Sequence, residues 1–287
     1  MTASTTPMLA KKRLGEALRA LRKTRGLTGG EAAELVGWTD SKISRIETAE
    51  SGVSLYDLEQ LLDLYETASA QRVDVLKLHR SSKAKQWSTH APYAGVLTAN
   101  YQSLIAYEAE CAEQWAYETC IWPGLLQTPK YAHAVISSGP LVQDYDDIDT
   151  LVSARTRRQE VLDRTDFELI AVVTLAPLLY QHGGPAVLKE QLRHVLTAME
   201  RPNVRVHVIP DNVSAGAYGG SMTVMHFADP ADPSVAYLET AVTTEEHTQP
   251  QVTRRIVRLI NHLQSAALDP PATRALIERR MDQLSDV

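Results

Sequence analysis

Cysteine and long apolar runs are the features this sequence lacks most clearly. Its 287 residues include only two cysteines, Cys111 and Cys120, too few for a disulfide framework, so a reduced setting is expected. No stretch approaches the roughly 18 consecutive apolar residues of a membrane helix. The opening MTASTTPMLAKKR contains no apolar core of a signal peptide. These absences predict a cytoplasmic protein without membrane contact.

The common motifs of catalytic and metal sites are missing as well. The nine histidines show no HExxH spacing, and no cysteine joins them in a zinc pattern. The acidic stretch QDYDDIDT lacks the glycine and the glutamate that a calcium loop needs. No Gly-x-Ser-x-Gly elbow and no nucleophile–base arrangement is apparent. We therefore expect no metal, no cofactor and no enzymatic activity.

Charge is distributed unevenly along the chain. Between Met8 and Arg45 there are nine Lys and Arg residues against four acids, a balance of +5. The whole chain carries −6, so the remainder carries −11. A basic segment on an acidic protein indicates a polyanionic partner at one end and disfavours the remainder as a second DNA contact. A solvated, charged helix is the alternative explanation of the basic segment.

The N-terminal part has the patterns of five helices. After a Thr/Ser/Pro-rich tail at 1–7, expected to be disordered, apolar residues recur at helical spacing and Gly26 ends the first helix. Thr28 and Glu31 have the spacing of a capping box for the second helix. The apolar residues assigned to these two helices are Leu14, Ala17, Leu18, Leu21, Ala32, Leu35 and Val36. Thr39 and Ser54 are predicted to cap the third and fourth helices, and a fifth helix is expected over 70–85.

The second and third of these helices are short and joined by a turn that contains Gly37, which predicts a helix-turn-helix. In that motif the later helix enters the major groove. Ile43 and Ile46 would face inward, so Arg45 and Ser41 would face base edges, where Arg can bind guanine bidentately. Lys23 and Arg25 would neutralise phosphate behind them. The full set of expected DNA-binding residues is Lys23, Arg25, Thr28, Thr39, Asp40, Ser41, Lys42, Ser44 and Arg45.

Residues 14–65 resemble the Xre/lambda-repressor helix-turn-helix domain, most specifically in the block SKISRIE. The resemblance implies a DNA-binding regulator. Such domains often place Gln or Ser near the start of the second helix, where the side chain meets phosphate. Here Gly29 and Gly30 stand at that place. Phosphate binding at this helix start would then rely on backbone N–H groups.

The pattern changes after residue 88. Pro92 and Gly95 interrupt a patternless stretch, which we interpret as a linker over 88–99 between a domain at 8–87 and another at 100–287. Helices are expected over Tyr101–Tyr117, Pro129–Ser137 and Asp147–Leu162. The runs FELIAVVTL, VRVHVIP, SMTVMHFA and SVAYLET are predicted strands, and amphipathic helices accompany them. The fold class is α+β: an all-α five-helix domain, a helical segment, and a small mixed α/β domain.

The second half has its own resemblance. YEAECAEQWAYETCIWPGLLQTPKYAHAVI looks like the C-terminal domain of actinomycete Xre-type regulators that are described as toxin–antitoxin-like. That resemblance implies a small protein partner. From the residues alone, WPGLLQTPKYA indicates a turn, a Thr128 cap and Pro129 at the first helical position. A pocket wall formed by Trp122 and Tyr131 is the alternative.

Together these observations predict a sequence-specific regulator that binds double-stranded DNA. Because a single module rarely binds tightly enough, we expect a homodimer on a palindromic operator, with the interface in the C-terminal domain. That domain would bind a partner protein or an effector, or dimerise. The alternatives are an antitoxin-like protein that mainly binds a small protein, and a small-molecule-sensing or enzymatic domain tethered to DNA.

Overall fold

The computed structural model describes residues 7–83, 87–139, 145–213, 219–240 and 243–284. The chain divides into two compact units, Met1–Trp87 and Ser88–Val287. Of the tail expected at 1–7, only Pro7 lies within the described residues, and it begins the first helix.

The first unit is all-helical, as the sequence predicts. Its helices are α1 (Pro7–Thr24), α2 (Gly29–Val36), α3 (Asp40–Glu47), α4 (Leu55–Leu64) and α5 (Ser69–Ser82). The capping box of Thr28 and Glu31 is present, and the side chains of Thr39 and Ser54 accept hydrogen bonds at the starts of α3 and α4. These caps satisfy backbone N–H groups that have no partner inside a helix.

The apolar stripes of the five helices meet in one core. Leu18, Ile43, Leu58 and Leu62 are among its fully buried members. The expectation that Leu35 is buried is wrong, because its side chain is 63% exposed. The buried face of α2 runs through Ala32 and Ala33, with Val36 half-buried, and Leu35 lies beside that face.

The second unit is built on a six-stranded mixed sheet. Its strands are β1 (Glu113–Glu118), β2 (Glu168–Val173), β3 (Val204–Val208), β4 (Ser221–His226), β5 (Val235–Glu239) and β6 (Thr244–His247). Their order is β3-β2-β1-β4-β5-β6. β1 pairs parallel with β2, and β2 with β3, whereas the remaining pairs are antiparallel. The α+β fold class expected from the sequence is confirmed.

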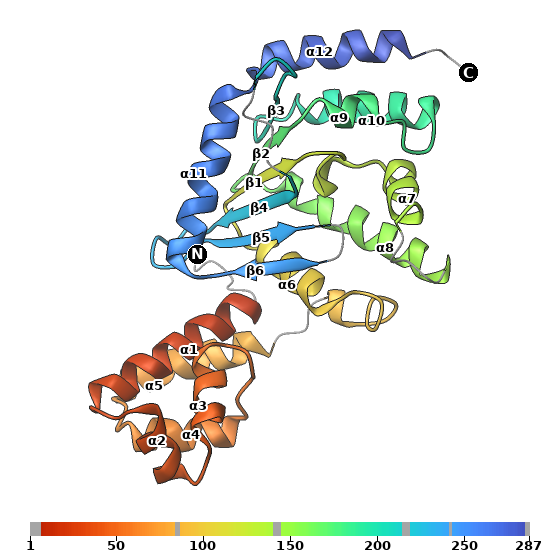
Figure 1. Ribbon diagram of the computed structural model, residues 1–287. Helices are drawn as coiled ribbons and strands as arrows, with labels where there is room; N and C mark the ends of the chain where they lie inside the picture. Colours follow the sequence, from red (N-terminus) through yellow and green to blue (C-terminus); the bar gives the residue numbers. More distant parts are fainter. Residues whose placement is uncertain (1–6, 84–86, 140–144, 214–218, 241–242, 285–287) are drawn as a thin grey trace. The chain divides into compact units, whose positions relative to one another are not determined.

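Helices surround this sheet (Figure 1). They are α6 (Ala99–Glu108), α7 (Pro129–Ser137), α8 (Tyr145–Arg158), α9 (Ala176–Leu179), α10 (Pro185–Ala198), α11 (Pro250–Ala266) and α12 (Pro270–Gln283). Short 3-10 helices are η1 (Trp87–Thr89), η2 (Gly124–Leu126) and η3 (Gln159–Asp163). α12 lies along β3 at one edge of the sheet, and α6 contacts β6 at the other.

Alternating side chains give β1 two different faces. Tyr117 packs with Ile256, Ile260 and Leu263 of α11 in one apolar cluster. Its neighbour Glu118 belongs to the opposite face. The helix α11 therefore seals one side of the sheet, and the other side faces the segment from α6 to α8.

Two sequence-based expectations about this unit are wrong. The predicted helix Tyr101–Tyr117 ends at Glu108, and the residues after Ala112 form β1, the central strand. Pairing with β2 and β4 outweighs the helix propensity of this Ala/Glu-rich stretch. The segment 88–99 is not a free linker, since Tyr93 and Leu97 are buried and the segment belongs to the second unit.

Candidate functional site

The turn between α2 and α3 has the geometry that the helix-turn-helix prediction requires. Gly37 ends α2 in the left-handed region with φ 70°, and its N–H donates to carbonyls of the last turn. Only glycine adopts this conformation without steric cost. The N–H of Trp38 then donates to the carbonyl of Ala33 at 2.8 Å. The chain thus reverses within three residues and begins α3 at Asp40.

The outer face of α3 carries the predicted base readers. Ile43 and Ile46 are 2% and 4% exposed, which fixes the rotation of the helix. Ser41, Ser44 and Arg45 are exposed on the other side. The Nε atom of Arg45 donates to the carbonyl of Ser41 at 3.3 Å. No acid in the described part of the chain forms an ion pair with Arg45, so its guanidinium can engage a base or a phosphate.

Lys42 is less available than its position at the edge of this face suggests. Its Nζ atom lies 3.0 Å from Oδ2 of Asp57 on α4. The same ammonium sits 3.5 Å from the ring centroid of Trp38. Its charge is therefore partly compensated within the protein, and its internal contacts hold α3 against α4.

The start of α2 is crowded by carboxylates. A Cβ atom built on Gly29 would collide with Oδ1 of Asp40, so the Asp40 side chain is turned toward this helix start. Glu31 accepts hydrogen bonds from the N–H and hydroxyl of Thr28, both at 2.7 Å, and these bonds lower the pKa of its carboxyl group. Two acidic side chains oppose a phosphate here. The geometry thus disfavours both the expected phosphate contact at α2 and the expected DNA contact of Asp40.

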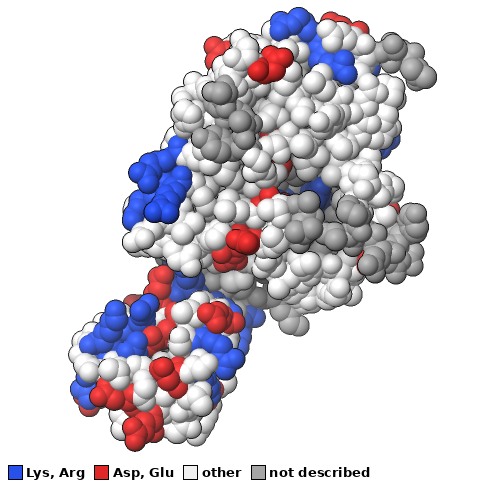
Figure 2. Space-filling model, viewed as in Figure 1, with Lys and Arg blue, Asp and Glu red and all other residues white. Residues whose placement is uncertain are grey.

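Phosphate contacts are better supplied by exposed cations on α1 and after it. Lys23 is exposed, and Arg25 pairs with Glu66 at 2.7 Å, with both partners well exposed. Such surface pairs contribute little, so Arg25 can exchange Glu66 for phosphate at small cost. On the face of this unit drawn in Figure 2, Lys and Arg are interspersed with Asp and Glu.

Sequence reasoning missed Arg19 as a candidate. Arg19 and Ser44 line a hollow of about 220 Å³ where α1 and α3 meet. Arg19 is exposed and precedes Lys23 by four residues, so both lie on one face of α1. That spacing was the signal in the sequence. The structure therefore adds Arg19 as a phosphate-binding candidate beside the reading helix.

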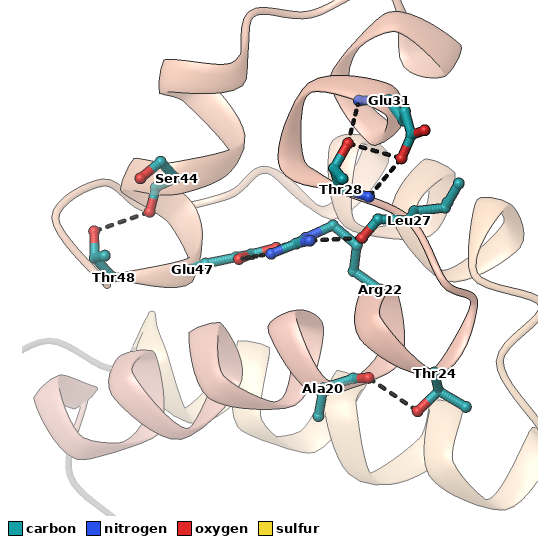
Figure 3. Close-up of polar contacts among 9 residues, drawn as sticks. All are labelled: Ala20, Arg22, Thr24, Leu27, Thr28, Glu31, Ser44, Glu47 and Thr48. Atoms are coloured by element: carbon teal, nitrogen blue, oxygen red, sulfur yellow. Dashed lines mark hydrogen bonds and ion pairs between the residues drawn. The ribbon is translucent and has the colours of Figure 1, made fainter.

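A buried ion pair fixes α3 to α1. Nε and Nη2 of Arg22 donate to the carboxylate of Glu47 at 2.6 and 2.8 Å, and Nη1 donates to the carbonyl of Leu27 at 2.7 Å (Figure 3). The two side chains are 10% and 7% exposed. Arg22 thus acts as a structural cation within the unit. The bidentate geometry orients α3 relative to the cations of α1.

Trp122 and Tyr131, suggested from the sequence as an alternative pocket wall, lie in the interior of the second unit. Both side chains are completely buried, and neither lines the cavity of about 370 Å³ in the second unit. Thr128 caps α7 and Pro129 occupies its first turn, as the sequence predicts. The two aromatic rings therefore belong to the core, and residues next to them line the cavity.

The second unit also has a local basic surface. Residues 88–287 include 15 Lys and Arg against 24 Asp and Glu. Yet Arg254, Arg255 and Arg258 are all exposed on α11, and Figure 2 shows a patch of Lys and Arg over this helix. The negative net charge of the second unit thus does not describe the local charge of this α11 surface, which is positive.

No helix in the described ranges has the length and apolar character needed to cross a membrane. No group of three or more His, Cys, Asp or Glu side chains within those ranges could hold a metal ion.

Comparison with known families divides the chain in the same way as the fold. Residues 13–76 match the family described as "Helix-turn-helix domain". Residues 101–279 match the "Domain of unknown function (DUF5753)". Comparisons with curated proteins and with solved structures gave no match. The helix-turn-helix match supports DNA binding by α2 and α3. Because the second match covers more than half of the sequence, the chain belongs to the DUF5753 family, with a helix-turn-helix domain preceding the family's own domain.

Proposed function

We propose that this protein is a sequence-specific transcription regulator of the Xre type, acting in the cytoplasm as a homodimer on a palindromic operator. The observation that carries the proposal is the α3 face, where Arg45 and Ser41 are exposed at a helix held by a helix-turn-helix turn. Arg45 would read guanine, and Ser41 and Ser44 would contact neighbouring base edges. Arg19, Lys23 and Arg25 would position the unit through phosphate contacts.

Two-fold pairing follows from the small size of the reading surface. One helix of eight residues covers a single half-site, which rarely gives the affinity of a regulator. Two copies would present two α3 helices to successive major grooves, roughly 34 Å apart. The dimer interface is proposed for the second unit, where Leu179 and Tyr180 expose 47% and 52% of their surface side by side.

The second unit is proposed to act without chemistry of its own. It would bind a partner protein or an effector, dimerise, or do both. A toxin–antitoxin-like role, in which a small protein partner releases the operator, is compatible with this arrangement. The structural observation that favours an effector is a cavity with charged and apolar lining residues on the face of the sheet away from α11.

Selection of bound duplexes from a randomised pool, using the full chain, tests the proposal. We expect a consensus with two inverted half-sites, and light scattering should give two chains per duplex. Affinity should fall steeply with salt, because each phosphate contact releases counterions. Absence of any enriched sequence would contradict sequence-specific regulation and favour the antitoxin-like alternative. A consensus without inverted symmetry, bound by one chain, would refute only the dimer.

A further inference from the structure

The second unit contains a cavity of about 370 Å³ between the sheet and the segment from α6 to α8. Its floor is formed by alternate residues of β1, namely Gln114, Ala116 and Glu118, with Thr223 of β4 opposite Ala116. The small side chains of Ala116 and Thr223 leave the middle of this face hollow. The volume lies within the range of roughly 300–1,000 Å³ found for small-molecule sites.

One wall of the cavity is acidic. Glu118 ends β1 and Glu239 ends β5, and Ser221 of β4 stands between them. The Ser221 hydroxyl donates to the Glu118 carboxylate. Glu118 and Glu239 both line the cavity. Two carboxylates are thus held across three neighbouring strands, where a ligand cation could lie between them.

The lining of the cavity also includes an incompletely paired arginine. Nη1 of Arg155, on α8, donates to Oε1 of Gln127 at 3.0 Å. Its Nε atom is buried without a hydrogen-bond partner among the described residues. Arg158 beside it is occupied, because Glu108 accepts from it at 2.6 and 2.8 Å and Tyr101 accepts at 2.9 Å. Arg155 also hydrogen-bonds the side chain of Tyr101, so its Nε atom is the donor left for a ligand carboxylate.

A second unpartnered group faces the same space. Gln114 is only 3% exposed, and its amide oxygen has no hydrogen-bond partner in the described part of the chain. Buried polar groups without partners are costly, so they indicate an absent ligand or water. The remaining wall is apolar. Its lining side chains are Val96, Leu104, Ile121, Val135, Ile136 and Leu151.

We infer that this cavity binds a small zwitterionic molecule with an apolar body, chemically similar to an apolar amino acid. Its carboxylate would pair with Arg155, its ammonium would lie between Glu118 and Glu239, and its side chain would fill the apolar wall. Charge-assisted hydrogen bonds of this kind are the strong ones in a partly enclosed site. The inference specifies the effector of the second unit, and so rests on the effector role proposed for it.

The protonation of Glu118 agrees with this arrangement. Burial and the nearby Glu239 raise the pKa of Glu118 to about 8, although the Ser221 hydroxyl, Arg155 and Arg158 act in the opposite direction. A ligand ammonium would stabilise the ionised carboxylate, so binding would release a proton. The affinity should therefore rise as pH increases from about 6 to about 8.

Isothermal titration of the full chain, without DNA, tests the inference. The probes are L-leucine, L-phenylalanine and L-tryptophan, and dipeptides made from them. Each is compared with two truncated analogues, one that lacks the carboxylate and one that lacks the amino group. We expect at least one zwitterion to bind, and its two truncated analogues to bind about ten- to a hundredfold more weakly. R155Q and E118Q should each lose affinity to a similar extent, whereas R157Q, an exposed arginine of the same helix, should not.

A116L gives an independent check, because the added side chain would fill the hollow floor. We expect this variant to keep its unfolding temperature and lose ligand binding. No binding by any probe would overturn the inference, and so would binding that R155Q and E118Q leave unchanged. DNA affinity measured on the same preparations distinguishes the ligand proposal from the regulator proposal. If the protein selects an operator but binds no zwitterion, only the ligand proposal is refuted.

Discussion

The carboxylate of Asp40 lies so close to Gly29 that a Cβ atom on Gly29 would collide with it. The first residue of α3 is thereby packed against the first residue of α2. This contact explains why a residue without a side chain stands at the start of α2. It also directs the side chain of Asp40 toward the start of α2.

Replacing Asp40 by Asn should therefore strengthen DNA binding generally. The substitution removes a negative charge near the expected phosphate path, which is worth roughly 1 kcal/mol at a solvent-exposed distance of a few ångströms. Electrophoretic mobility shifts on the operator and on a scrambled duplex would measure the change. We expect D40N to tighten both complexes about equally. A selective loss of operator binding would instead mean that Asp40 reads a base.

Glu47 is predicted to be essential to the stability of the first unit. E47A would leave the buried guanidinium of Arg22 unpaired, which costs about 3–5 kcal/mol in comparable sites. E66A is the matched control, because it breaks the exposed pair with Arg25 and should cost about 1 kcal/mol or less. Chemical denaturation followed by circular dichroism would compare them.

E66A should also strengthen DNA binding slightly, since it frees Arg25 for phosphate. Equal destabilisation by E47A and E66A would contradict the structural role assigned to the Arg22–Glu47 pair.

The stability of the second unit should decrease with rising pH because of Glu118. Its pKa is raised from an ordinary 4.5 to about 8, chiefly by burial. The folded chain thus holds the Glu118 proton more tightly than the unfolded chain does between these values. Linkage then makes unfolding easier as pH increases through this window, and Glu239, Arg155 and Arg158 are the charges that modulate it.

The check is the thermal unfolding temperature of the full chain at about pH 5 and about pH 8, for the wild type and for E118Q. We expect the wild type to lose more stability over this interval than E118Q. If the unfolding temperatures of the two proteins changed with pH in the same way, Glu118 would have an ordinary pKa in the folded chain.

Much of the fold was predictable because local signals and final structure agree. The caps at Thr28, Thr39 and Ser54 lie where the sequence places them. The strands β2 to β5 fall within the expected apolar runs. These elements have strong propensities, turn residues at their ends, and one clearly apolar face.

β1 was not predictable in this way. Its residues continue an Ala/Glu-rich stretch without a glycine or proline to mark the end of α6. Its strand conformation comes from parallel pairing with β2. The paired residues, such as Glu113 and Glu168, are 55 positions apart in the sequence. β6 was missed for a related reason: its four residues, TEEH, are polar, and pairing with β5 alone makes them a strand.

Of the two candidate sites, one could be predicted from the sequence and the other could not. Exposure of Ser41, Ser44 and Arg45 follows from the spacing of Ile43 and Ile46, so the sequence predicts it. The cavity could not be found from the sequence, because its polar residues come from strands and helices far apart in the chain.

The central claim is that α3 reads DNA sequence through Arg45. The most direct measurement is the binding preference of R45A, determined by duplex selection beside that of the wild type and K23A. We predict that R45A loses about 1–3 kcal/mol on the operator and loses its preference at one base pair per half-site. K23A should weaken all sequences alike and reduce the dependence on salt. An unchanged sequence preference in R45A would contradict the account.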